Sequence, residues 1–166
     1  MTATANVQKQ LTDKFGEDVY GFTETYGMLS FEANPAINLK VLNFLNDTES
    51  LRFTFLNDLT AIHYPDRTGK ELMVVYLLQN IRESLRVRFK ISVPVDKPEV
   101  FSATSIFATA NWLEREAYDF FGVQFIGHPN LIRIMNVDEM DYHPLRKEFP
   151  LEDQRRMDKD DDMFGR

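Results

Sequence analysis

Three predicted strands in the middle of the chain constrain its fold more than any other feature. Residues 85–93 alternate apolar and polar side chains, a pattern that is typical of a strand with one buried face. Residues 72–78 are apolar at every position, as in a central strand covered on both faces. Residues 51–62 make the third strand, which is expected to pass a bulge at Asn57 and Asp58. A sheet is therefore the expected framework of this chain.

The remaining segments predict an α+β domain. Residues 65–70 contain the proline, aspartate and glycine of a hairpin turn, so the strands beside it are expected to pair antiparallel. Weaker patterns predict strands over residues 18–24 and 27–32. Three segments repeat apolar residues at helical spacing and are expected to form helices: 6–15, 35–45 and 102–121. Residues 1–140 are therefore predicted to form a mostly antiparallel sheet with helices packed on one side.

Residues 141–166 are expected to form an extended C-terminal arm. This segment contains Pro144, Pro150 and dense mixed charge, with few apolar anchors. Such a composition cannot offset the entropy that the segment would lose by ordering alone. We therefore expect the arm to be ordered mainly where a partner covers it.

Charge, hydropathy and cysteine content argue against several classes of protein. The net charge of −7 argues against a nucleic-acid binder, which needs a concentrated basic face. No apolar run approaches the roughly 20 residues of a membrane span. The first ten residues lack the apolar core of a signal peptide, so the chain is expected to stay where it is made. The absence of cysteine leaves no thiolate for a disulfide or an iron–sulfur cluster.

Glu114 lies within the apolar face of the predicted helix over residues 102–121. A buried carboxylate must be paired, hydrogen-bonded or protonated, because an isolated buried charge is very costly. Its candidate partners come after the helix: Arg133, His128 and Arg146. Three roles remain open, namely fixing the following loop onto the domain, acting as a catalytic or proton-relay carboxylate, and forming an ion pair with another subunit.

Two surfaces are candidates for protein contacts. Trp112 falls opposite the apolar face of the same helix, beside Arg115, and an exposed aromatic residue there is typical of an interface. The alternative is that a second layer of the same fold covers Trp112. Arg86, Arg88 and Lys90 form a basic ladder on one strand face, which is either solvated or meets an acidic partner.

Two His-Pro steps, at His128 and His143, are candidate metal ligands together with Glu114 or Glu116. However, no helical pair of histidines supplies two ligands from one rigid element. The proline after each histidine restricts the histidine backbone to extended conformations, which suits loops on a surface. We therefore interpret both histidines as structural residues. The chain also lacks G-x-S-x-G, a glycine-rich phosphate loop and a dinucleotide fingerprint.

The densest concentration of special residues lies between positions 111 and 150. It comprises Glu114-Arg115-Glu116, Tyr118 to Gly122, Gly127-His128-Pro129, Leu131 to Ile134, His143 to Lys147 and Phe149-Pro150. In this order, the motif resembles the signature of the 30-kDa-subunit family of NADH–quinone oxidoreductase, which is respiratory complex I. Two positions depart from the family pattern, because Tyr142 stands where many relatives have glycine and Ile132 where arginine is common. A positive φ at Tyr142 would be strained.

The resemblance implies a scaffold subunit of the peripheral arm of this proton-translocating enzyme, with no chemistry or cofactor in the chain itself. The large quinone-site subunit of the arm would be its main partner, and other subunits would hold NAD, FMN, iron–sulfur clusters and quinone. The protein would be peripheral on the cytoplasmic face of a bacterial inner membrane and would meet that membrane only through the complex. The residues expected to serve structure or interfaces are Trp112, Glu114, Arg115, Glu116, His128, Arg133, His143, Arg146 and Lys147.

Two other functions stay open at this point. The first is the equivalent subunit of a related membrane-bound hydrogenase or ferredoxin-dependent complex. The second is a stand-alone metal hydrolase that uses His128, His143 and Glu116.

Overall fold

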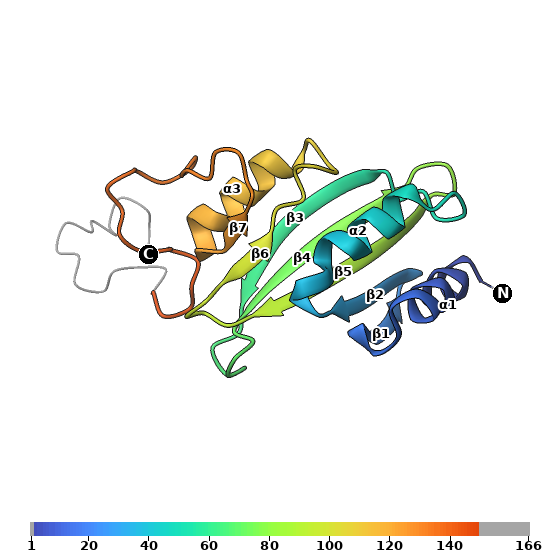
Figure 1. Ribbon diagram of the computed structural model, residues 1–166. Helices are drawn as coiled ribbons and strands as arrows, with labels where there is room; N and C mark the ends of the chain where they lie inside the picture. The colour runs from blue at the N-terminus through green and yellow to red at the C-terminus, as the bar shows by residue number, and fades with distance from the viewer. Residues whose placement is uncertain (1, 150–166) are drawn as a thin grey trace, which may run out of the picture.

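The computed structural model describes residues 2–149 and contains a five-stranded sheet with helices on one face (Figure 1). The order of its strands is β1-β2-β5-β4-β3, with a parallel β2–β5 pair and antiparallel pairs elsewhere. These strands are β1 (Val19–Thr25), β2 (Met28–Ala33), β3 (Phe55–His63), β4 (Leu72–Asn80) and β5 (Leu85–Val93). The predicted α+β class and mostly antiparallel sheet are confirmed.

The helices and a second, smaller sheet complete the domain. The α-helices are α1 (Ala3–Phe15), α2 (Asn38–Asp47) and α3 (Ala110–Phe121), and the 3-10 turns are η1 (Gly16–Asp18) and η2 (Pro35–Ile37). Strands β6 (Glu99–Phe101) and β7 (Gln124–Ile126) pair in parallel on either side of α3 in the sequence. The sequence did not predict these two strands, because three residues are too few to show an alternation.

The buried core lies between the sheet and the helices. Phe31 on β2, Phe89 on β5 and Tyr76 on β4 stack in a row, with successive ring centroids 5.2 and 5.4 Å apart. Leu11 of α1 and Leu42 of α2 are fully buried as well. Because removing apolar surface from water is the main favourable term in folding, this row of rings ties three strands into one core.

The strand predicted over residues 51–62 begins later than expected, at Phe55. The residues before it form a turn after α2, where the Phe53 N–H donates to the Leu45 carbonyl at 2.9 Å and Arg52 has a φ of 48°. Leu51 and Phe53 are buried in this turn, so their alternation reflects burial and not strand geometry. The expected bulge is confirmed, because the register of β3 against β4 shifts just before Asp58.

The helix predicted over residues 102–121 also begins later, at Ala110. Residues 102–109 form consecutive turns, including one in which the Phe107 N–H donates to the Ala103 carbonyl at 2.9 Å. A second correction concerns β4, where Tyr76 is fully buried but Val75 and Leu77, on the opposite face, are partly exposed. The helices therefore cover one face of this strand, and the described residues leave the other face partly open.

Truncating the central ring of the stacked row should destabilise the domain strongly. We expect Phe89→Ala to lower the free energy of unfolding by about 3–5 kcal/mol, because it removes buried surface and leaves a cavity. Phe55→Ala on β3 is the matched control, since Phe55 is 46% exposed and its loss should cost less than about 1 kcal/mol. Urea denaturation of both variants measures the difference, and equal losses would contradict this description of the core.

Candidate functional site at the C-terminal end of α3

Helix α3 ends at Gly122, which adopts the left-handed conformation with φ 79° and ψ 22°. The Gly122 N–H donates to the Tyr118 carbonyl at 2.8 Å and closes the last turn. A helix end leaves its final carbonyl groups without helical partners, and these groups carry partial negative charge. The segment after the helix supplies the missing donors.

Residues from the start of the predicted arm bind the last carbonyls of α3. The carbonyl of Asp119 accepts from His143 Nδ1 at 2.9 Å, and the carbonyl of Phe120 accepts from the Leu145 N–H at 3.1 Å. Arg146 Nε donates to the Phe121 carbonyl at 2.7 Å. Because donors, one of them cationic, meet the negative end of the helix, both the hydrogen bonds and the helix dipole stabilise this contact. Residues 141–149 are therefore held by their own chain, whereas the sequence predicted that a partner orders the arm.

Gly122 makes this close approach possible. A β-carbon at position 122 would lie 2.5 Å from Arg146 Nη2 and 2.6 and 2.7 Å from His143 Cδ2 and Nε2. These distances are shorter than carbon atoms tolerate, so a larger residue would displace the segment or the helix end.

Asp119 is the centre of the junction and is fully buried. Its Oδ1 accepts from Arg133 Nη1 at 2.6 Å and from Asn136 Nδ2 at 3.0 Å. Its Oδ2 accepts from three successive backbone N–H groups, those of Ile134, Met135 and Asn136, at 3.1, 2.8 and 3.0 Å. Burial alone would raise the pKa of Asp119, but the donors from Asn136, Met135 and Arg133 outweigh burial and hold the pKa well below its usual range. Asp119 is thus a charged anchor for residues 133–136.

Arg133 connects this anchor to the predicted arm. Besides Asp119, its guanidinium donates to the carbonyls of Met140 at 2.7 Å and Tyr142 at 2.9 Å. The ion pair with Asp119 is largely shielded from solvent, which keeps it from being screened by water. Tyr142 is not among the residues with a positive φ, so its departure from the family pattern causes no backbone strain.

Glu114 is fully buried one turn before Asp119, but its partners differ from those predicted. It accepts from Ser102 Oγ at 2.6 Å and from the Ala103 N–H at 2.6 Å. The predicted partners His128, Arg133 and Arg146 bind other groups, so those three assignments are wrong. The bonds to Glu114 also explain the late start of α3, because they hold residues 102 and 103 as a non-helical turn against it.

Burial raises the pKa of Glu114 to about 7, although the hydrogen bonds from Ser102 and Ala103 act to lower it. The surroundings accommodate a proton on Glu114. A protonated carboxyl can donate to Ser102 Oγ, which lies 2.8 Å from Thr104 Oγ1 and can donate onward to it. No cationic side chain among residues 2–149 forms an ion pair with Glu114.

The two histidines bind backbone groups in separate places. His128 Nδ1 accepts from the Asn130 N–H at 3.0 Å, so its Nε2 carries the proton and donates to the Asn111 carbonyl, also at 3.0 Å. The pKa of His143 lies below its usual value, mainly because of burial, although its bond to the Asp119 carbonyl acts to raise it. Within residues 2–149, no three His, Cys, Asp or Glu side chains gather as metal ligands, and Glu116 is exposed. The geometry does not support the hydrolase hypothesis.

The outer side of the junction exposes large apolar side chains. Trp112 is 63% exposed, and the Arg115 guanidinium lies 5.1 Å from the centre of its ring. Arg115 also donates to the carbonyls of Ile132 at 3.1 Å and Arg133 at 3.2 Å, which ties the loop to α3. We call the following residues the apolar face: Trp112, Ile132, Met135, Val137 and Leu145, which are 63, 51, 66, 64 and 46% exposed.

Lys147 extends the junction to the main sheet. Its backbone N–H donates to Nδ1 of the buried His63, the last residue of β3, at 3.0 Å. Asp119, Gly122, Ser102 and His63 were absent from the predicted site. A glycine directly after a helix was the available signal for Gly122, since that position favours the left-handed conformation. No local pattern shows that a later loop covers Asp119.

Comparisons with known proteins follow the same region. The family model described as "Respiratory-chain NADH dehydrogenase, 30 Kd subunit" matches residues 31–155. The chain belongs to this family. The match includes α3 and all of the junction described above.

Curated relatives that are named as a subunit of NADH-quinone oxidoreductase support the family assignment. The protein of Nocardioides sp. is 41% identical over 125 residues, which is 75% of this chain and 50% of that protein. The protein of Mycolicibacterium gilvum is 38% identical over 152 residues, or 87% of this chain and 66% of that protein. The protein of Mycolicibacterium paratuberculosis is 45% identical over 123 residues, or 74% and 52%. The chain therefore spans about half to two thirds of the length of these relatives.

Solved structures share the fold. A chain of the membrane-bound sulfane sulfur reductase, an archaeal respiratory membrane complex, matches with a TM-score of 0.77 at 23% identity, over 90% of this chain and 87% of that one. A trypsin-resistant fragment of Nqo5 matches with a TM-score of 0.64 at 26% identity, over 78% of this chain and all of that one. In residues 2–149, no helix combines the length and the apolar character that crossing a membrane requires.

Filling the space at Gly122 should release the segment that caps α3. Gly122→Ala brings a methyl group against Arg146 and His143, whereas Gly127→Ala has a similar φ of 85° with no atom within 4 Å. Both variants bear the cost of a left-handed alanine, so we expect Gly122→Ala to lose about 2 kcal/mol more free energy of unfolding. Limited trypsin digestion should also cleave after Arg146 faster in Gly122→Ala. Equal behaviour of the two variants would contradict the close packing at Gly122.

Removing the titration of Glu114 should flatten the pH dependence of stability. The folded chain keeps a proton on Glu114 between the ordinary pKa of 4.5 and about 7, whereas the unfolded chain releases it. The contribution of Glu114 to the free energy of unfolding is therefore fully present below pH 4.5 and falls by at most about 3 kcal/mol as pH rises to 7 and above. In Glu114→Gln this decline should be absent.

Urea denaturation of the wild type and Glu114→Gln at pH 5 and pH 8 measures this difference. The glutamine keeps an acceptor for the Ala103 N–H and a donor for Ser102 Oγ, so its fold should be retained. The low pKa of Asp119 acts in the opposite direction and only below its ordinary value of 3.8, outside this pH range. A pH dependence that is unchanged by the substitution would show that Glu114 does not titrate in this range.

Proposed function

We propose that this chain is a scaffold subunit of the peripheral arm of proton-translocating NADH–quinone oxidoreductase, without chemistry of its own. In this proposal it docks onto the quinone-site subunit and supports electron transfer from NADH to quinone by holding other subunits in place. The membership of the 30-kDa family and the names of its relatives support the enzyme class. The junction at α3 supports the scaffold role.

The observation that carries the proposal is the division of labour within residues 112–147. The charged groups Asp119 and Arg133 bind several partners inside the chain and hold the loop in one conformation. The apolar residues Met135 and Val137 of the same loop remain mostly exposed. A fixed backbone that presents large apolar side chains is suited to binding, since little ordering entropy is lost on association.

The cofactors of the reaction are placed in partner subunits. NAD, FMN, iron–sulfur clusters and quinone would be held there, and the absence of cysteine means that no thiolate of this chain can ligate a cluster. The chain would then be peripheral, on the cytoplasmic face of a bacterial inner membrane, and would contact the membrane only through its partners. Its contribution to the rate would be the spacing and orientation of those partners.

The equivalent subunit of a related redox complex is the second candidate. The fold match to a sulfane sulfur reductase chain shows that this architecture also occurs outside NADH-quinone oxidoreductases. The curated relatives at 38–45% identity favour the NADH-quinone oxidoreductase. The subunits that assemble with the chain in its own cells would separate the two candidates.

A charge placed on the apolar face should prevent assembly without unfolding the chain. We expect Met135→Glu to reduce the recovery of the quinone-site subunit with the tagged chain by roughly tenfold or more, because an interface would bury the new carboxylate. Ile81→Glu is the matched control, since Ile81 is 61% exposed in the turn between β4 and β5, away from this face. Its recovery of the quinone-site subunit should equal that of the wild type.

The measurement is affinity purification from cells that lack the untagged chain, with subunits quantified by mass spectrometry. Equal recovery of the quinone-site subunit with both variants would contradict docking through the apolar face. Recovery of a hydrogenase-type large subunit, with no NADH-binding subunit, would support the second candidate instead.

A further inference from the structure

The face of the main sheet that the helices leave open carries a row of basic side chains. Arg86, Arg88 and Lys90 lie on this face of β5, at alternate positions between the buried Val87 and Phe89. The residues paired with them across the sheet share the face, as the 3.4 Å ion pair between Lys90 and Glu32 shows. Neither the core nor the α3 junction uses the two arginines.

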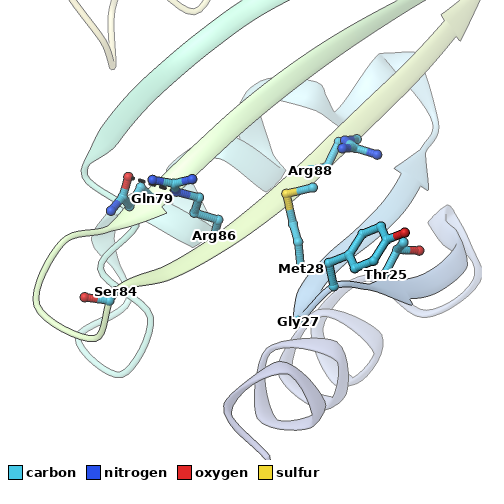
Figure 2. A pocket seen from close by; sticks show the side chains of 8 residues that line it. Thr25, Gly27, Met28, Gln79, Ser84, Arg86 and Arg88 are labelled. Carbon is cyan, nitrogen blue, oxygen red and sulfur yellow. Dashed lines mark hydrogen bonds between the residues drawn. The ribbon is translucent and has the colours of Figure 1, made fainter.

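A cavity of about 650 Å³ lies at the end of this row (Figure 2). One wall is the turn between β1 and β2, with Tyr26 and Met28, and the other wall is β5, with Arg86 and Arg88. Tyr26 is fully exposed and has a φ of 52°, so the turn presents its aromatic ring to solvent. The cavity thus combines two guanidinium groups with two large apolar side chains.

Both arginines lack a carboxylate partner among the residues that the structure describes. Arg86 Nε donates to Gln79 Oε1 at 3.3 Å, and the same oxygen accepts from Asn57 Nδ2 at 3.0 Å. This neutral network orients the Arg86 side chain and leaves its two terminal nitrogen atoms without a hydrogen-bond acceptor in residues 2–149. Charge-assisted bonds to carboxylates are available to these groups.

A second polar group next to the arginines also lacks a partner. Ser30 pairs with Arg88 across the parallel β2–β5 ladder, so the two side chains share the open face. The Ser30 hydroxyl is buried and has no hydrogen-bond partner among residues 2–149. A buried polar group without a partner costs free energy, which an incoming acceptor beside Arg88 would recover.

The spacing of the arginines selects the shape of the ligand. Residues two apart on a strand lie about 6.7 Å from each other along it, which equals the spacing of alternate side chains in any extended segment. Arg86 and Arg88 therefore match two acidic side chains of an extended peptide, and Tyr26 and Met28 can contact an apolar side chain beside them. The chain carries a net charge of −7, so a locally unpaired basic pair is a specific feature and not part of a general basic surface.

We propose that this cavity is the docking site for an extended acidic segment of a partner protein, whose carboxylates bind Arg86 and Arg88. The site lies on the open face of the sheet, and the apolar face of the α3 junction is a separate surface. The proposal goes beyond the scaffold function and does not require that the quinone-site subunit be the partner.

A labelled peptide of alternating glutamate and valine is the probe, and its binding to the full chain is measured by fluorescence anisotropy. We expect Arg86→Glu/Arg88→Glu to weaken this binding by roughly tenfold or more, because two charge-assisted contacts become repulsive. Lys9→Glu/Lys14→Glu on α1 is the matched control, since both lysines are exposed and the change in net charge is identical. The control should bind within about twofold of the wild type.

A measurement on the wild type alone removes any dependence on the folding of the variants. Addition of the peptide should shift the NMR signals of the Arg86 and Arg88 Nε–H groups and leave the Arg67 signal unchanged. The proposal is overturned if the wild type shows no shift into the millimolar range, or if the lysine control loses binding equally. It is also overturned if inorganic phosphate or anionic lipid vesicles bind the site more tightly than the peptide does. These results leave the assembly experiment on Met135 unaffected, so the two proposals can fail independently.

Discussion

The structure depends on how the C-terminal end of α3 obtains its hydrogen bonds. The last carbonyls of a helix need donors from elsewhere, and here His143, Leu145 and Arg146 provide them. The segment after the helix consequently folds back over α3, and Gly122 leaves the space for it to do so. This contact decides where residues 128–149 lie and which of their side chains face outward.

Two buried carboxylates on α3 illustrate opposite solutions to the same problem. Asp119 remains charged because an arginine, a side-chain amide and three backbone N–H groups surround it. Glu114 has only two donors, so burial raises its pKa to about 7. Asp119 holds the segment after the helix, and Glu114 holds the turn before it. Both acids therefore serve to position the backbone, which is consistent with a scaffold.

The sequence predicted those features that depend on local periodicity. The strand over residues 85–93 and the buried position of Glu114 follow from spacing alone, and both are observed. The partners of Glu114 were not predictable in this way, because Ser102 and Ala103 lie in a segment whose apolar residues imitate a helix. Asp119 escaped for a similar reason, since its burial comes from a loop that crosses the polar side of α3. Contacts between distant segments leave no periodic trace in either one.

The central claim is that the chain forms its docking loop by itself, through Asp119, before any partner binds. Hydrogen exchange of the amides of Ile134, Met135 and Asn136 in the isolated chain tests this claim most directly, because all three donate to Asp119 Oδ2. We predict exchange much slower than in an unfolded peptide, as for other internally bonded amides. Exchange at the rate of an unfolded chain, with protection only after a partner is added, would contradict the account.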